Sequence, residues 1–230
     1  MELKIIARIY TDFDEKFGIP RQSGISPESI GKIVFEKEYR RPEAVRGLTE
    51  YSHIWLIWQF SMSVREKWSP TVRPPRLGGN KKMGVFATRS PYRPNPIALS
   101  SVKLEKIVDD TELGPVLIVK GADILNGTPI YDIKPYLKYT DSHPDAVCGF
   151  ADDVMDYKVR VLPLPKEIID LLGEQRAKAL VSVLETDPRP GYKRSDTGEY
   201  GMKFSGFDIS FSVTDGALSV TGIKKAGCAG

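Results

Sequence analysis

The chain has 230 residues, enough for one compact domain or for one domain with a smaller second one. Hydrophobic residues make up 41% and charged residues 27%, which is typical of a globular protein and excludes a disordered one. Two cysteines and two histidines are too few for a disulfide framework or a Cys/His zinc module, and no apolar run is long enough to cross a membrane as a helix. The first residues lack the apolar segment and cleavage site of a signal peptide, so we expect a cytoplasmic protein that needs neither a metal nor a membrane.

The net charge of +3 conceals an uneven distribution. Between residues 65 and 93, eight basic residues accompany one acidic residue, whereas between residues 105 and 156 eleven acidic residues accompany four lysines. A basic stretch of this kind favours a polyanionic partner such as RNA. The alternative is a solvated loop whose charges pair with the acidic half, and charge alone does not separate the two.

Short apolar runs separated by glycine and proline predict a series of strands. We expect strands at residues 3–10, 29–36, 53–60, 82–88, 97–108, 116–119 and 129–133. The run HIWLIWQF at 53–60 is almost continuously apolar, which is typical of a strand buried in a core. This many strands, with few helical segments between them, favour a closed or strongly curved sheet.

The pattern changes after about residue 156. Apolar residues between 165 and 184 recur mostly at helical spacing, and prolines flank this segment on both sides. Two further apolar runs, at 208–213 and 217–223, are separated by an Asp-Gly turn signal. We therefore predict a mainly β protein, with a β-rich domain at residues 1–152 and a small α+β domain at residues 157–230.

The sequence lacks the motifs of the common nucleotide-binding folds. No G-x-G-x-x-G follows a predicted strand, and no G-x-x-x-x-G-K-[ST] loop occurs. The regular alternation of strands and helices that builds a doubly wound sheet is also missing. A nucleotide cofactor of this protein would therefore bind on a different scaffold.

The most distinctive segment lies between residues 68 and 96, where six prolines alternate with arginines. Because proline fixes φ, it lowers the entropy cost of holding a loop in one shape. An arginine between prolines is thus a preoriented cation, and a preoriented guanidinium suits phosphates and carboxylates.

Several motifs of the chain together resemble one known family. They are PRQSG at 20–24, VRPPRLGGN at 72–80, MGVFATRSPYRPNPI at 83–97, DILNGTPIYDIKPYL at 123–137 and DPRPGYK at 187–193. By these motifs, which cover nearly the whole chain, the sequence is identified as a member of the YaeB/TsaA-like (TrmO) family of tRNA methyltransferases.

The resemblance implies a fold, a reaction and partners. The implied fold is a β-barrel methyltransferase domain, distinct from Rossmann-type enzymes, in a homodimer. The implied cofactor is S-adenosyl-L-methionine, and the implied reaction methylates N6 of threonylcarbamoyladenosine at position 37 of tRNA. The partner is then the tRNA anticodon loop that carries this nucleoside.

The resemblance also transfers a set of cofactor-binding positions. The matching residues here are Pro20, Arg21, Gln22, Ser61, Met62, Arg89, Leu99, Asp123, Ile124, Leu125 and Asn126. Bacterial members often carry His-Gln where this chain has Ser61 and Met62, and an aspartate where it has Asn126. Backbone contacts at these positions do not depend on the side chain, whereas side-chain contacts do.

Asp132 and Arg93 are the predicted catalytic residues. Methyl transfer from a sulfonium is an in-line displacement in which the target nitrogen also loses a proton. The candidate acceptors of that proton are Asp123, Asp132 and Asp141, of which Asp132 is favoured, whereas Asp123 is expected to be a cofactor ligand. The alternative for Asp132 is an ion pair with Lys134 or a motif arginine. Arg89 and Arg93 are expected to contact the cofactor, an RNA phosphate or the threonyl carboxylate, with an ion pair to the acidic half as the alternative.

The predicted RNA contacts are cations and aromatic side chains, because cations bind phosphates and unpaired bases stack on aromatic rings. They are Arg73, Arg76, Tyr92, Arg189, Tyr192 and Lys193. Solvation, or a structural role, is the alternative for each of these residues.

Two other functions stay open from the sequence. One is a methyltransferase that acts on a different substrate with the same scaffold, which the departures at Ser61, Met62 and Asn126 motivate. The other is a non-catalytic RNA-binding module that has kept the basic loop.

Overall fold

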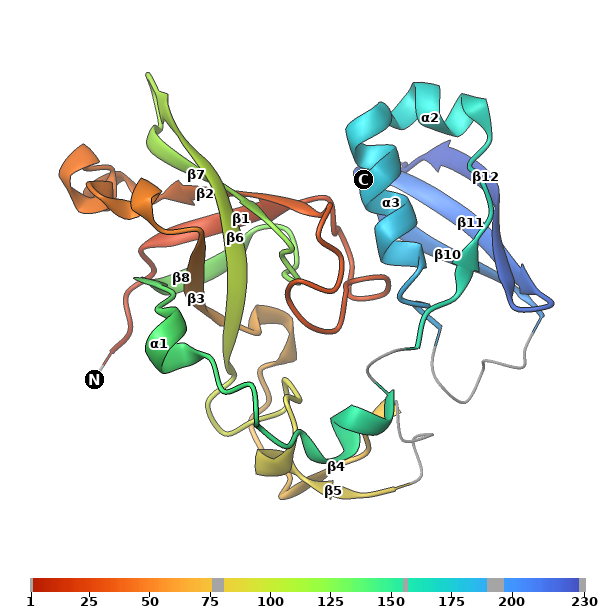
Figure 1. Ribbon diagram of the computed structural model, residues 1–230, viewed down its shortest axis with the longest axis horizontal. Coiled ribbons are helices and arrows are strands. Elements are labelled where there is room, and N and C mark those ends of the chain that lie inside the picture. Colours follow the sequence, from red (N-terminus) through yellow and green to blue (C-terminus); the bar gives the residue numbers. More distant parts are fainter. Residues whose placement is uncertain (1, 76–80, 155–156, 190–196, 228–230) are drawn as a thin grey trace.

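The computed structural model describes residues 2–75, 81–154, 157–189 and 197–227. Its strands form a closed barrel of six strands, a four-stranded sheet accompanied by two helices, and a two-stranded sheet of β4 (Thr71–Val72) and β5 (Met83–Gly84) (Figure 1). The predicted mainly β fold with a barrel is confirmed. None of the helices in the described part of the chain is long and apolar enough to span a membrane.

The barrel closes because every strand pairs with a neighbour on both sides. Its strands are β1 (Ala7–Thr11), β2 (Ile30–Phe35), β3 (His53–Gln59), β6 (Ile97–Asp110), β7 (Gly114–Lys120) and β8 (Thr128–Pro135). They pair antiparallel in the order β1-β2-β7-β6-β3-β8, and β8 returns to β1. Along β3, Ile54, Leu56 and Trp58 are buried in the core, so the residues between them lie on the outer face.

Short turns connect the barrel strands. The turns η1 (Lys37–Tyr39), η2 (Pro42–Val45) and η3 (Leu48–Glu50) lie between β2 and β3, and α1 (Lys138–Asp141) and η7 (Gly149–Val154) follow β8. Between β3 and β6 lie η4 (Ser61–Ser63), the paired β4 (Thr71–Val72) and β5 (Met83–Gly84), and η6 (Val85–Ala87). The strand predicted at 82–88 is therefore only two residues long. Val85 is its one buried side chain, so the alternation that sustains a strand is missing.

The second half of the chain builds a separate sheet. Its elements are β9 (Arg160–Val161), α2 (Lys166–Leu172), α3 (Glu174–Leu184), β10 (Glu199–Phe204), β11 (Phe207–Thr214) and β12 (Ala217–Lys225), with strand order β10-β11-β12-β9. The single helix predicted over 165–184 is divided at Gly173, whose φ of 77° is not helical. Strand β10 was not predicted, although its buried Met202 and Phe204 alternate as strand residues do.

A segment that follows β1 packs into the core of this second sheet. We call residues 12–19 the strap, and Figure 1 shows the chain after β1 leaving the barrel toward α3. Phe13 is 1% exposed and its ring meets that of Phe204 edge-on, with centroids 6.1 Å apart. Gly18 lies directly against Met202 with a φ of 90°, so a side chain at residue 18 would be both strained and in collision.

Hydrogen bonds fasten the strap to the same sheet. The backbone oxygen of Asp12 accepts from the Ser205 amide at 2.8 Å, and its carboxylate accepts from Arg176 Nε at 3.2 Å. Further along, Asp14 accepts from the Gly206 amide at 3.0 Å and Glu15 accepts from the Lys203 amide at 2.8 Å. The strap is therefore covalently part of the barrel and structurally part of the second domain.

We expect Phe13→Ala to lower the free energy of unfolding by about 3–5 kcal/mol, because it removes a fully buried ring and leaves a cavity. Urea or thermal unfolding measures the loss. Tyr10→Ala, which truncates a 45% exposed ring on β1, is the matched control and should change stability far less. Equal effects of the two substitutions would contradict a buried anchor.

Candidate cofactor and RNA site

The loop Pro20–Gln22 continues directly from the strap and is held from two sides. Arg21 Nη2 donates to the backbone oxygen of Arg189, in the second domain, at 3.2 Å. Gln22 Oε1 accepts from Arg89 Nη1 at 2.5 Å. Three of the cofactor positions implied by the family resemblance thus lie together, between the second domain and the Arg89 turn.

Asp123 is a desolvated carboxylate at the start of the loop between β7 and β8. Ser100 Oγ donates to its Oδ1 at 2.7 Å, and Ser100 Oγ in turn accepts from Trp58 Nε1 at 3.0 Å. Burial raises the pKa of Asp123, while the Ser100 hydrogen bond, the charge of Arg89 and the backbone of Ser23 lower it in part. Such a carboxylate gains strongly from a bound hydroxyl or ammonium donor, as in a ribose or an amino-acid group.

The residues after Asp123 connect the same loop to β1 and the strap. Ile124 is fully buried, and its backbone oxygen accepts from Thr11 Oγ1 at 2.8 Å. Asn126 Oδ1 accepts from the Thr11 amide at 3.2 Å, and Asn126 Nδ2 donates to Asp14 Oδ1 at 3.3 Å. An aspartate at 126, as the family often has, would place a second carboxylate against Asp14. The asparagine is therefore the complementary residue in this chain.

Ser61 and Met62, the other positions where this chain differs from the family, also lie beside the strap. Lys16 Nζ donates to the backbone oxygen of Met62 at 2.6 Å and lies 3.2 Å from Ser63 Oγ. This contact uses the backbone of residue 62, so it does not depend on the side chain there. Leu99 lies on the outer face of β6 opposite Ile57, with 52% of its surface exposed.

The two predicted catalytic residues have defined partners. Arg93 Nη1 donates to the backbone oxygens of Val85 at 3.1 Å and Thr88 at 2.7 Å, so Arg93 holds the turn that presents Arg89. Asp132 lies on β8 and pairs with Lys134 Nζ at 3.0 Å, the alternative considered from the sequence. The roles of both in catalysis stay predictions.

The predicted RNA contacts fall into three groups. Arg73 is exposed beside β4, and Tyr92 is covered on one face by the Arg65 guanidinium, 3.7 Å from its ring centroid. Arg189 differs from the expectation, because its side chain is 1% exposed and its guanidinium pairs with Asp187 at 2.9 Å, so this structure gives it a structural role. Arg76, Tyr192 and Lys193 lie outside the described residues.

The Asp187–Arg189 pair also shapes the contact to Arg21. Asp187 has a φ of 51° and accepts from Arg189 Nε and Nη2 and from Tyr157 Oη. Burial raises the pKa of Asp187, but the hydrogen bond and charge of Arg189 outweigh burial, so its pKa lies below the usual range. The pair fixes the turn whose Arg189 backbone oxygen accepts the hydrogen bond from Arg21 of the Pro20–Gln22 loop.

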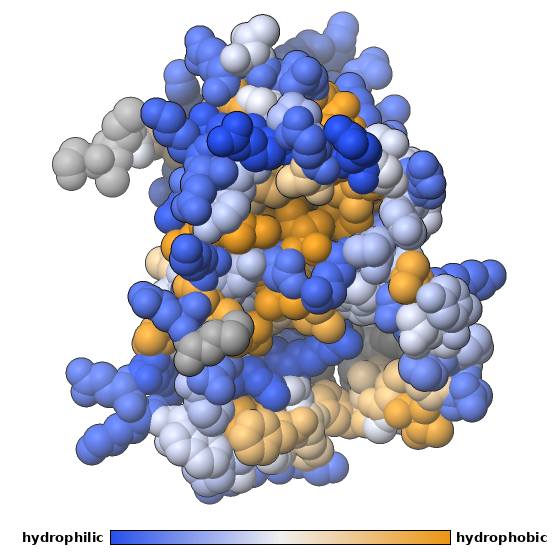
Figure 2. All heavy atoms as spheres, turned by 90° about the vertical axis from the view of Figure 1, so that its left-hand side faces the viewer, coloured by the Kyte–Doolittle hydropathy of each residue, from blue (hydrophilic) through white to orange (hydrophobic). Residues whose placement is uncertain are grey.

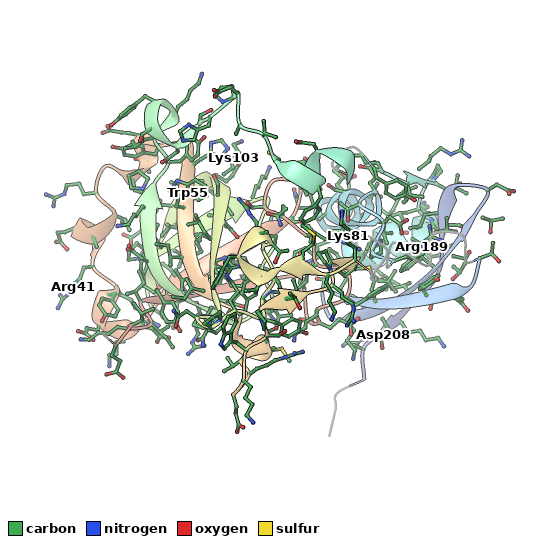
Figure 3. All side chains as sticks on the ribbon, turned by 90° about the horizontal axis from the view of Figure 1, so that it is seen from below. Arg41, Trp55, Lys81, Lys103, Arg189 and Asp208 are labelled. Atoms are coloured by element: carbon green, nitrogen blue, oxygen red, sulfur yellow. The ribbon has the colours of Figure 1, made fainter. Side chains whose placement is uncertain are left out.

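Of the cations in the basic stretch that the structure describes, six are exposed and Arg93 is half-buried. Among residues that the structure describes, none of these seven cations forms a salt bridge, namely Arg65, Lys67, Arg73, Lys81, Lys82, Arg89 and Arg93. The alternative that these charges pair with the acidic half is not seen. Figure 3 views the molecule from the side of β4 and β5, where Lys81 lies.

Exposed apolar side chains accompany these cations. Met62 is 65% exposed, Val64 60%, Trp68 51% and Phe86 71%, and the rings of Trp68 and Phe86 lie 6.1 Å apart. Figure 2 shows apolar side chains gathered along the lower edge of the molecule, at the height of β4 and β5 in Figure 1. A surface with both cations and apolar side chains is typical of a macromolecular interface.

Several contributing residues were missed from the sequence. Ser100 is a polar residue at an inward position of a barrel strand, a signal that a strict strand alternation would reveal. Phe13 and Lys16 carry no local signal, because their importance depends on partners far along the chain. No group of three or more His, Cys, Asp or Glu residues in the described part of the chain is placed to hold a metal ion.

The closed antiparallel barrel, with these motif loops on its outside, places the protein among methyltransferases not built on the Rossmann fold. Solved structures agree over nearly the full length. A crystal structure of TrmO gives a TM-score of 0.78 at 31% identity over 99% of this chain and 98% of that one. TrmO from Pseudomonas aeruginosa gives 0.77 at 30% identity over 97% and 98%.

The chain belongs to the tRNA-methyltransferase O family. The family model of the N-terminal domain matches residues 8–142 and that of the TrmO C-terminal domain matches residues 169–226. The Escherichia coli (strain K12) protein named tRNA (adenine(37)-N6)-methyltransferase is 38% identical over 95% of this chain and 96% of its own length. The human protein of the same name is 39% identical over 61% of this chain and 31% of its own length.

We predict that Asp123→Asn stabilises the protein at neutral pH. The folded-state pKa of Asp123 is raised, so the folded state loses its proton later than the unfolded state, and stability falls as pH rises above the ordinary aspartate value. The melting-temperature gain of the variant over wild type should therefore be larger at about pH 7 than at about pH 4. A gain that shrinks with rising pH would contradict the assignment.

Proposed function

We propose that this protein transfers a methyl group from S-adenosyl-L-methionine to N6 of threonylcarbamoyladenosine at position 37 of tRNA. The observation that carries the proposal is the match of both domains to one family, whose E. coli member bears the name of the adenine(37)-N6 reaction. The cations of the basic stretch, which form no salt bridge among the residues that the structure describes, support a tRNA anticodon loop as the substrate, in the cytoplasm where tRNA is found.

The residues present fit the cofactor. Asp123 offers a desolvated carboxylate for the hydroxyl or ammonium groups of the cofactor, and Arg89 lies beside Gln22 at the edge of the same positions. When bound, the cofactor supplies an electrophilic methyl group on sulfur. The chain has to align the target nitrogen with that group, and the strap and Arg93 hold the motif loops in place for it.

The proton balance of the reaction gives Asp132 its proposed part. A nitrogen–carbon bond forms as the carbon–sulfur bond breaks, and the N6 proton leaves for a base. Asp132 is our candidate acceptor, in a pair with Lys134 that its side-chain exposure of 44% leaves accessible. Arg93 contributes by positioning Arg89.

We also propose a homodimer. The exposed apolar side chains of Met62, Val64 and Phe86 would be buried by a second copy, and their burial favours association. Analytical ultracentrifugation should give twice the mass of the 25.7 kDa chain. A monomer at micromolar concentration would contradict this part of the proposal.

The reaction is tested by incubating the protein with the cofactor and tRNA that carries threonylcarbamoyladenosine, followed by nucleoside mass spectrometry. The expected product is that nucleoside heavier by one CH2 unit. Unmodified tRNA serves as the control and should remain unchanged. Calorimetric cofactor binding without any product would overturn the substrate, and the absence of cofactor binding would favour a non-catalytic RNA-binding module.

A further inference from the structure

A pocket of about 450 Å³ lies on the outer face of the barrel, beside the cofactor motifs. It is lined by Ser23, His53, Trp55, Arg89, Ser101, Tyr136 and Asp141. Its volume lies within the ~300–1,000 Å³ range of small-molecule sites. Ser23, Arg89 and Tyr136 belong to the family motifs quoted above, whereas His53, Trp55, Ser101 and Asp141 have no role in the function proposed above.

Aromatic rings make up one part of this wall. The rings of Trp55 and Tyr136 lie 5.6 Å apart, and those of His53 and Tyr136 lie 6.2 Å apart. Trp55 is on β3, Tyr136 follows β8, and both side chains are only half-buried. Figure 3 shows Trp55 on the barrel strands, well away from Arg189 of the second domain. Half-exposed rings that converge on a pocket are the usual platform for a nucleic-acid base.

Trp55 and Asp141 fix each other. Trp55 Nε1 donates to Asp141 Oδ2 at 2.8 Å, and the same oxygen accepts from the Leu137 amide at 2.8 Å. The Leu137 amide, then Trp55 and His143, lower the pKa of Asp141, so the pocket keeps a carboxylate at neutral pH. Both hydrogen bonds use Oδ2, which leaves Oδ1 to accept from an N–H group of a ligand.

The pocket lies next to the predicted cofactor position Leu99, and the spacing of residues along β6 gives the distance between them. Leu99 and Ser101 are two residues apart on the outer face of β6, and their partners on β3 are Ile57 and Trp55. Two residues along a strand correspond to about 7 Å. A ligand over Ser101 and Trp55 would therefore be a direct neighbour of a cofactor over Leu99, as methyl transfer requires.

We propose that this pocket receives the target base itself, a purine that carries an anionic substituent on its exocyclic nitrogen. The proposal rests on the function proposed above. The purine stacks on Trp55 beside Tyr136, its substituent N–H donates to Asp141, and its carboxylate faces Arg89. A pocket with one cation, one anion and aromatic rings complements such a modified base, whereas a bare adenine lacks a partner for Arg89.

Binding, measured without turnover, tests the proposal. The probe is an anticodon stem-loop RNA with threonylcarbamoyladenosine at position 37, titrated in the presence of S-adenosylhomocysteine, and the same RNA with plain adenosine is the comparison. We expect Trp55→Ala to weaken binding of the modified RNA by about tenfold, the loss of one base stack. Asp141→Asn should reduce the preference for the modified RNA over the plain one.

Matched variants separate this role from a loss of folding. Trp55→Phe keeps a ring for stacking and should bind RNA more tightly than Trp55→Ala, provided that both melt as folded proteins. Tyr139→Ala truncates an 87% exposed ring on α1, outside the pocket, and should bind as wild type. In all variants the calorimetric affinity for S-adenosyl-L-methionine should stay within about twofold of wild type.

Two outcomes would overturn the proposal. Weaker cofactor binding by Trp55→Ala, with unchanged RNA binding, would make the pocket part of the cofactor site. Unchanged binding of both would leave the pocket without a role in recognition. If wild-type protein binds the modified RNA in a Trp55-dependent manner but forms no methylated product, the reaction proposed above fails while the base pocket stands.

Discussion

Burial of Phe13 in the second domain is the constraint on which the rest of the site depends. The strap crosses from β1 to the core around Phe204 and then returns as the loop Pro20–Gln22. On the way Lys16 binds the backbone of Met62, and Asp14 binds Asn126. The segment anchored by Phe13 thus contacts or continues into three of the predicted cofactor positions, at residues 20–22, 62 and 126, which lie far apart in the sequence.

Burial of the Asp123 carboxylate lowers the stability of the free protein and would favour the binding of a hydrogen-bond donor. Asp123 is desolvated and receives its hydrogen bond from Ser100, which Trp58 orients from inside the barrel. This arrangement disfavours the charged carboxylate in the free protein and favours it when a donor arrives. In the basic stretch, the described cations form no salt bridge, so their mutual repulsion would be relieved by a phosphate backbone.

Local patterns in the sequence predicted the strands of the barrel well. They did not predict the packing of the strap into the second domain. The run at 53–60 is a strand because its apolar residues fit one side of a core, and Gly173 divides the predicted helix by a purely local effect. Phe13 has no such signal, because its burial is decided by Phe204 far along the chain. Likewise, the sequence predicts Arg189 as an RNA contact, whereas in the structure it is buried in an ion pair with Asp187. The asparagine at 126 is explained only by the structure, in which its Nδ2 donates to Asp14.

The most direct test of the central role of the strap is the affinity of Phe13→Ala for S-adenosyl-L-methionine, measured by calorimetry at a temperature where the variant is folded. Val213→Ala removes buried volume from the same core at a residue of β11 outside the strap, and serves as the control. We predict that Phe13→Ala weakens cofactor binding by at least about tenfold, while Val213→Ala leaves it within about twofold of wild type. Wild-type affinity in Phe13→Ala would contradict the role of the strap in positioning the loop Pro20–Gln22 for the cofactor.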